Sequence, residues 1–220
     1  MRVLAIDTTS PRGSVAVAGP EGILAEARLV TTAGHSRWLL LAVEALLRGL
    51  GVAAGALDVF AVTVGPGSFT GLRVGLGSVQ GLALASGRPC VGLPTLDVLA
   101  GAVAGASGTV VALVDAFRGE VYSGVYDAAG LLLRPRGVGP LAAVLEGLPA
   151  GAAFVGEAAI DHRDAIRGAV RDAVFPATPR FLAAPLATAA LRLAVAGATV
   201  PASGLRPLYL RDAGVHPPPA

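Results

Sequence analysis

The sequence predicts an α/β fold made of two similar halves, each a mixed sheet covered by helices in the order βββαβα. An apolar run that ends in Asp occurs twice, at residues 2–7 and 110–115, and a turn and two further strand-like runs follow each copy. A helix, a strand ending in glycine and a second helix then follow in both copies. An internal duplication is the simplest account of this order.

The composition indicates a protein with more apolar surface than its own core would bury. Of the 220 residues, 54% are hydrophobic, and the mean hydropathy is +0.68. This length fits one large domain or two small ones, and so apolar a chain favours a surface that a partner covers. All 17 basic residues are arginine, but the net charge is only +2. Three arginines at 163, 167 and 171 stand beside acidic residues, which favours a charge-paired face over a nucleic-acid stripe.

The first half contains three strands, a long helix, a fourth strand and a second helix. Short apolar runs bounded by turn residues predict the strands, and longer apolar segments predict the helices. The expected strands cover residues 2–7, 14–18, 23–30 and 57–64, and the expected helices cover 35–50 and 70–86.

The second half repeats this order after a glycine-rich join at residues 101–108. Strands are expected at 110–115, 120–126, 131–134 and 152–156, and helices at 140–147, 157–170 and 185–196. We therefore divide the chain into an N-terminal subdomain, 1–105, which carries the dimerisation helices, and a C-terminal subdomain, 106–220. The terminal tail is expected to pack back on the first half.

A glycine-rich segment, residues 65–77, closes the fourth strand and opens the second helix, with Ser68 or Thr70 as the N-cap. Two interpretations are open. The free N–H groups at the helix start, beside a turn without bulky side chains, could bind an anion. The glycines could instead allow another backbone to approach closely, since each costs a helix about 1 kcal/mol relative to Ala and needs a steric reason. Two pairs lie one helical turn apart: Gly71 with Gly75, and Gly77 with Gly81.

Polar residues at the ends of the two Asp-terminated strands are candidates for a phosphate site. Asp7, with the hydroxyls of Thr8 and Thr9, could meet a phosphate or a hydrated magnesium ion, or Asp7 could accept turn N–H groups as an Asx cap. The candidate nucleotide or phosphate residues are Asp7, Thr8, Thr9, Gly65, Gly67 and Asp115.

The two long helices of the first half are candidates for a protein interface. Arg37, Glu44 and Arg48 fall within about 40° of one another on the first helix, so the remaining circumference is nearly all apolar. Such a helix can face its own sheet and a second protein at once, and two helices from each of two copies could form a four-helix bundle. The expected interface residues are Trp38, Leu40, Leu47, Gly71, Val74, Gly75 and Ser78.

No metal site is expected from the histidines or the cysteine. Leu39 stands where a His-x-x-x-His pair starting at His35 would need its second ligand, and the other histidines are His162 and His216. His35 is expected to cap or pack at the helix start. Cys90 is the single cysteine, and its apolar neighbours favour a buried, inert thiol.

No targeting or membrane-spanning segment is expected. Asp7 interrupts the first apolar run before a signal-peptide core could form, and glycines break the charge-free stretch 98–114. We therefore expect a cytoplasmic protein.

Several segments, spread over nearly the whole chain, resemble the bacterial TsaB (YeaZ) family. They are Asp7-Thr8-Thr9, the segment GPGSFTGLRVG at 65–75, Pro94-Thr95-Leu96, VDAFRGEVY at 114–122 and PLYLR at 207–211. Twin βββαβα halves are also the pattern of the actin-like ATPase and sugar-kinase superfamily. The resemblance therefore implies a duplicated fold of that superfamily.

The resemblance further implies a non-catalytic paralogue of TsaD, the transferase that makes threonylcarbamoyladenosine (t6A) next to the anticodon of tRNA. The implied partners are a TsaD-type transferase and a TsaE-type ATPase, with a homodimer when the chain is alone and tRNA met only through the complex. TsaD has a metal-binding His-x-x-x-His where this chain has His35 and Leu39, so no metal is implied. Superfamily ATPases have a Gly-Gly pair for adenosine where this chain has Gly156-Glu157, so no cofactor is implied for this chain alone.

Two other functional classes stay open. One is an active ATP-dependent enzyme of the same superfamily, a small kinase or a peptidase, for which Asp7 and Asp115 are the candidate carboxylates. The other is a regulator of an unrelated partner, since apolar helices would serve that role as well.

Overall fold

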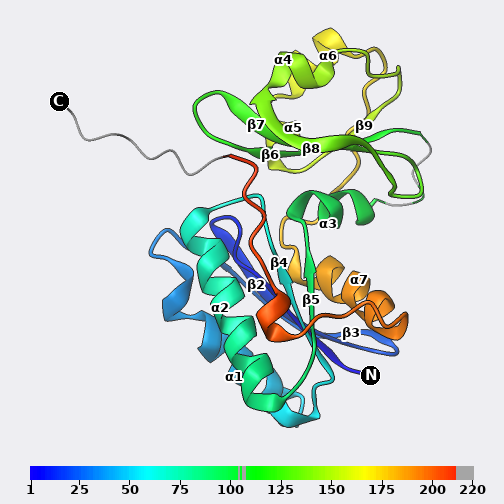
Figure 1. Cartoon of the computed structure of the whole chain (residues 1–220). Helices are drawn as coiled ribbons and strands as arrows, with labels where there is room; N and C mark the ends of the chain where they lie inside the picture. The colour runs from blue at the N-terminus through cyan, green and yellow to red at the C-terminus, as the bar shows by residue number, and fades with distance from the viewer. Residues whose placement is uncertain (104, 106–107, 212–220) are drawn as a thin grey trace, which may run out of the picture.

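The computed structural model describes residues 1–103, 105 and 108–211, and it has two lobes, each built on one sheet (Figure 1). The first sheet has the strand order β3 (Gly22–Val30), β2 (Arg12–Gly19), β1 (Val3–Asp7), β4 (Val59–Thr63), β5 (Cys90–Leu93). The second has the order β8 (Leu132–Pro140), β7 (Glu120–Tyr126), β6 (Val110–Asp115), β9 (Ala153–Val155).

The two sheets share one topology, which confirms the duplicated α/β fold expected from the sequence. In the first sheet β1 pairs antiparallel with β2 and parallel with β4, and β2 continues into β3. In the second, β6 pairs antiparallel with β7 and parallel with β9, and β7 continues into β8. The first sheet adds β5, which pairs parallel with β4.

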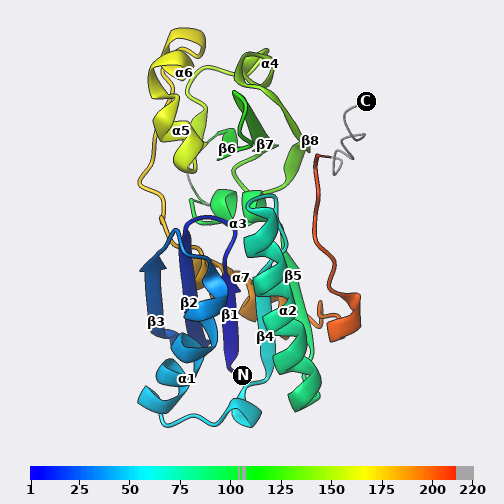
Figure 2. The same cartoon turned by 90° about the vertical axis from the view of Figure 1, so that its left-hand side faces the viewer.

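Helices cover both faces of the first sheet (Figure 2). A 3-10 turn, His35–Arg37, leads into α1 (Leu39–Gly49), which lies over β2 and β3, while α2 (Phe69–Ser86) lies over β4 on the same face. Alternate residues of β1 point to opposite faces, as the strand period requires. Leu4 and Ile6 pack with α1 and α2, and Val3 and Ala5 pack with α7 (Ala183–Val195).

The second lobe carries short helices. They are α4 (Leu141–Leu145), α5 (Glu157–Asp161) and α6 (Arg163–Ala169). The single helix expected at 157–170 is divided at His162, whose backbone departs from helical geometry. A further helix, α3 (Thr95–Gly101), was not expected from the sequence; it lies between the lobes and contacts both β6 and α7.

The packing does not follow the expected division at residue 105. Although α7 belongs to the second half of the sequence, it packs on β1 and β2 of the first sheet. The segment after it returns along the first lobe: the Leu208 N–H donates to the Val64 carbonyl at 2.7 Å, and Val200 pairs with Cys90. The segment from Val200 to Leu208 thus lies along the first lobe, while residues 212–220, including His216, lie outside the described part. Among the described residues, no helix combines the length and apolar character needed to cross a bilayer.

Candidate functional site

The candidate phosphate residues of the first lobe gather where β1 and β4 end. Asp7 is 1% exposed, and its Oδ1 accepts hydrogen bonds from Thr9 Oγ1 at 2.7 Å, Thr63 Oγ1 at 2.6 Å and the Thr9 N–H at 3.2 Å. The Asx-type contact considered for Asp7 is therefore present. Burial raises the pKa of the Asp7 carboxyl, and the hydrogen bonds from Thr63 and Thr9 offset part of that rise.

The start of α2 uses its own polar groups to close this region. Ser68 is the N-cap and its Oγ accepts the Gly71 N–H at 3.2 Å, while the Ser68 N–H donates to the Thr9 carbonyl at 2.7 Å. The Gly65 carbonyl accepts the Thr95 N–H at 2.7 Å, and a Cβ on Gly67 would lie 2.5 Å from the Thr9 carbonyl oxygen. Two of the N–H groups at this helix start, those of Ser68 and Gly71, are therefore engaged within the chain rather than free for an anion.

Asp115 stands apart from this cluster, on the second lobe. Its side chain is exposed at the end of β6, and its Oδ1 accepts the Phe117 N–H at 2.9 Å. This contact caps a tight turn in which Phe117, Arg118 and Gly119 all have positive φ. Asp115 thus has a turn-forming role in the structure.

Asp7→Asn is expected to raise the melting temperature at pH 7.5, and the gain is expected to shrink toward pH 4. Because the folded chain binds the Asp7 proton more tightly than the unfolded chain, whose value is near 3.8, the free energy of unfolding falls as pH rises from 3.8 through the higher folded-state pKa. Asn keeps an acceptor for the two threonine hydroxyls but cannot ionise. Melting curves of both proteins at pH 4 to 8 test this; a difference independent of pH would contradict it.

Gly71 and Gly75, expected at the interface, are instead buried inside the first lobe. A Cβ on Gly71 would lie 1.9 Å from the Thr8 carbonyl oxygen, and one on Gly75 would lie 2.5 Å from Thr8 Oγ1. Thr8 Oγ1 also donates to the Gly71 carbonyl at 2.8 Å. The interface assignment of these two glycines was wrong, and the alternative of close packing is confirmed for them, because α2 must approach the end of β1.

The second pair of glycines lies on the outer side of α2. Gly77 and Gly81 are exposed, and a Cβ on either would meet nothing within 4 Å. Val74 and Ser78 lie between these two sides and are partly buried. The outer side of α2 is therefore a smooth strip that a neighbouring helix could approach.

The outer side of α1 exposes two leucines together with the Glu44–Arg48 ion pair. Leu40 and Leu41 are 56% and 65% exposed, whereas Leu47, also expected at the interface, is 7% exposed and packs in the core with Leu39 and Val43. The assignment of Leu47 was wrong because residues 39, 43 and 47 form the stripe that faces the sheet. The same spacing could have identified Leu41 as an outward-facing residue, because it lies off the stripe formed by residues 39, 43 and 47. We call Leu40, Leu41, Gly77, Gly81 and the partly buried Val74 and Ser78 the α1–α2 face.

His35 and Trp38 form a small cluster at the start of α1. Trp38 is half-buried, and its Nε1–H donates to His35 Nδ1 at 3.1 Å, which places the imidazole proton on Nε2, 2.8 Å from the Ser10 carbonyl. Both ring nitrogens are therefore engaged within the chain. The expectation that His35 packs at the helix start is confirmed, and Trp38 contributes an internal contact as well as a partly exposed surface.

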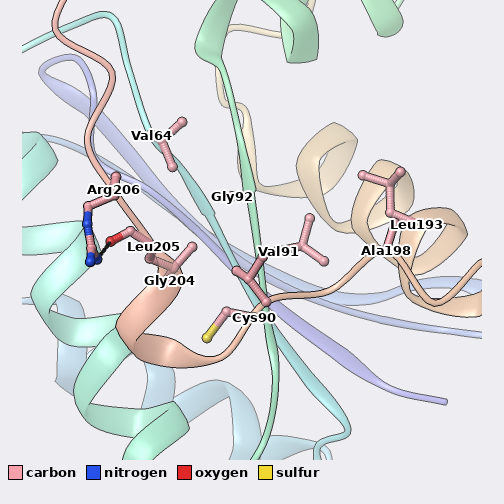
Figure 3. Close-up of a pocket in the computed structure, with 10 residues that line it drawn as sticks. Val64, Cys90, Val91, Gly92, Leu193, Ala198, Gly204, Leu205 and Arg206 are labelled. Carbon is pink, nitrogen blue, oxygen red and sulfur yellow. Dashed lines mark hydrogen bonds between the residues drawn. The ribbon is translucent and has the colours of Figure 1, made fainter.

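A cavity of about 300 Å³ lies between β5, the end of α7 and the returning C-terminal segment (Figure 3). Its walls are mostly aliphatic. Arg206 also lines it, and its Nη1 donates a hydrogen bond to the Leu205 carbonyl at 2.9 Å. Cys90 contributes to its lining but is fully buried, as expected, and this burial raises the pKa of the thiol to about 11.

Cys90 is expected to react with Ellman's reagent only after unfolding. At pH 8, a thiol with a pKa of about 11 is roughly one-thousandth thiolate, and the buried sulfur offers no path of attack. Absorbance at 412 nm should stay flat in native buffer and rise by one equivalent in denaturant. Rapid stoichiometric reaction of the native protein would show that the segment over Cys90 opens easily.

Comparison with known proteins places this geometry in a family. The family model described as "TsaD: tRNA N6-adenosine threonylcarbamoyltransferase" matches residues 22–214. The TsaB protein of Escherichia coli, named for tRNA threonylcarbamoyladenosine biosynthesis, is 37% identical over 129 residues, which are 58% of this chain and 55% of that protein. The TsaB protein of Bacillus subtilis is 32% identical over 60% of this chain and 58% of its own length. The matches thus span only a little over half the length of these two relatives.

Other relatives match along nearly their whole length. The uncharacterized protein Rv3421c of Mycobacterium tuberculosis is 32% identical over 98% of this chain and 94% of its own. The structure of YeaZ from Pseudomonas aeruginosa is 30% identical, with a TM-score of 0.75 over 95% of this chain and 99% of that one. An Arthrobacter polyphosphate/ATP-glucomannokinase, 14% identical with a TM-score of 0.53, shares the fold alone. The chain therefore has the actin-like ATPase and sugar-kinase fold and belongs to the TsaB (YeaZ) family.

Proposed function

We propose that this chain is a non-catalytic subunit that pairs with a TsaD-type transferase in the cytoplasm, together with a TsaE-type ATPase, for t6A modification of the adenosine 3′ of the anticodon. The observation that carries the proposal is the α1–α2 face, where Leu40 and Leu41 are more than half exposed. Two exposed leucines on α1, with two exposed glycines on α2 over the same face of the sheet, are the kind of surface that a partner covers. The names of the E. coli and B. subtilis relatives support the pathway.

The same face is proposed to serve a homodimer when the chain is alone. The match of the TsaD family model to this chain supports a common origin of the two proteins, so each presents a similar helix pair. A self-complementary surface can accept the related surface in the same pose, and the two pairings then compete. tRNA meets this chain through the complex.

The packing around Asp7 favours a non-catalytic role for this chain. The carboxyl group is buried and held by Thr9 and Thr63, and the N–H groups of Ser68 and Gly71 at the start of α2 bond within the chain. A phosphate would have to displace these contacts to reach Asp7. We therefore propose that the chain acts without a nucleotide of its own.

Reconstitution tests the proposal directly. The chain is mixed with the TsaD-type and TsaE-type proteins of the same organism, tRNA and the threonylcarbamoyl-adenylate, and t6A is measured by mass spectrometry of digested tRNA. Modification is expected only when this chain and the transferase are both present, and the chain alone is expected to show no ATP hydrolysis. Full modification without this chain, or ATP hydrolysis by the chain that Asp7→Asn abolishes, would overturn it.

A further inference from the structure

The two lobes meet around α3, which is fixed to both. Leu96 and Leu99 of α3 belong to one apolar cluster with residues of the first sheet, of α7 and of the second sheet. Asp97 accepts hydrogen bonds from the Tyr126 hydroxyl at 2.7 Å and from Arg136 Nε at 2.6 Å, both on the second sheet. A joint around one short helix, apolar except for these contacts of Asp97, fixes the distance between the lobes and is the place about which a hinge motion would turn.

An ion pair crosses the lobe junction on the β2 side. Arg12 Nη1, at the start of β2, pairs with Glu157 Oε1, in the first turn of α5 on the second lobe. Arg180 approaches the same carboxylate at 4.0 Å. The Arg12 and Glu157 side chains are 25% and 43% exposed, so solvent and salt screen this pair less than a pair on an open surface.

A second ion pair crosses the junction from the C-terminal segment. This segment is fastened along the first lobe by the pairing of Val200 with Cys90, by Gln80 Nε2 donating to the Ala202 carbonyl at 3.2 Å, and by the Leu208 contact. It ends on the second lobe, where Arg211 pairs with Glu120 and donates to the Ala116 carbonyl at 3.0 Å.

The two pairs lie toward opposite sides of the molecule. Arg12 belongs to β2, whereas the C-terminal segment runs along the other side, next to β5 (Figure 2). Each pair joins a first-lobe element to the second lobe, and neither lies within the apolar cluster around α3. Two contacts on opposite sides of a joint oppose rocking in both directions.

We propose that Arg12–Glu157 and Arg211–Glu120 act as a double latch that holds the two lobes in one relative orientation. The latch is built from the chain's own charges, so the orientation needs no bound ligand. Removing both carboxylates frees the lobes to rock about α3, while removing one leaves rocking restricted from the other side.

The test measures the distance between the lobes by double electron–electron resonance. Spin labels are attached at Ala54→Cys, on the exposed turn Ala54–Ala56 of the first lobe, and Ala150→Cys, exposed on the second lobe, in a Cys90→Ala background. The double variant Glu120→Gln/Glu157→Gln is expected to widen the distance distribution at least twofold. The charge swap Arg12→Glu/Glu157→Arg is expected to stay narrow, since it restores one pair and leaves the other intact.

Glu44→Gln is the matched control, because it removes an ion pair with Arg48 that lies within α1 and crosses no junction. Its distribution is expected to equal that of the parent protein. A second measurement needs no variant: raising sodium chloride from 0.05 to 1 M should widen the distribution of the parent protein. A folded double variant with the parent's narrow distribution, or a distribution insensitive to salt, overturns the proposal and assigns the fixed orientation to the joint around α3.

Discussion

Replacing Gly71 by alanine is expected to destabilise the chain by about 3 kcal/mol, which lowers the melting temperature by roughly 6–12 °C. The new Cβ would lie 1.9 Å from the Thr8 carbonyl oxygen, and a backbone oxygen cannot rotate away as a side-chain tip can. The start of α2 must then move off the end of β1, which stretches the bond from Thr8 Oγ1 to the Gly71 carbonyl. Thermal denaturation followed by circular dichroism measures the effect.

Gly77→Ala is the matched control, with the same substitution six residues further along the same helix. A Cβ there meets nothing within 4 Å, so the gain in helix propensity is unopposed. The free energy of unfolding is expected to increase by about 0.5–1 kcal/mol, and the melting temperature is expected to rise with it. Equal effects of the two substitutions would contradict the assignment of Gly71 to internal packing and Gly77 to the surface.

The double substitution Leu40→Glu/Leu41→Glu is expected to weaken binding of a TsaD-type partner at least 30-fold and to convert any homodimer to monomer. Both side chains are more than half exposed on α1, so the fold should tolerate the charges. In a complex, however, two carboxylates would be buried against an apolar surface, and loss of a central apolar anchor costs about 2 kcal/mol or more. Isothermal calorimetry gives the affinity, and sedimentation velocity gives the oligomeric state.

Leu131→Glu controls for a general effect of placing charge on an exposed leucine. Leu131 is 69% exposed, close to the 65% of Leu41, but it lies in the turn before β8 on the second lobe. Its affinity for the partner is expected to match that of the parent chain. If the two variants weakened binding equally, or if the α1 variant bound normally, the partner would not use the α1–α2 face.

The local patterns in the sequence determined the strands and the duplication, but not α3 or the division of the helix at His162. Apolar runs such as 110–115 carry their strand signal within a few residues, and the Asp-turn-strand order repeats clearly enough to predict two sheets of one topology. The motif at 65–75 also indicated the TsaB (YeaZ) family, since its glycines and Ser68 are specific in type and spacing. Burial of Cys90 followed from its apolar neighbours.

Only the tertiary structure decided which side of each helix faces the protein and which faces outward. Gly71 and Gly77 look alike in sequence, yet one lies against Thr8 and the other against open space, because the orientation of α2 depends on contacts with β1 and β4. Leu47 and Leu41 differ for the same reason. The contacts of Arg12 with Glu157 and of Arg211 with Glu120 each join residues that are more than 90 positions apart and on different lobes. Sequence periodicity carries no information at such separations, since the folding of the whole chain brings these charges together.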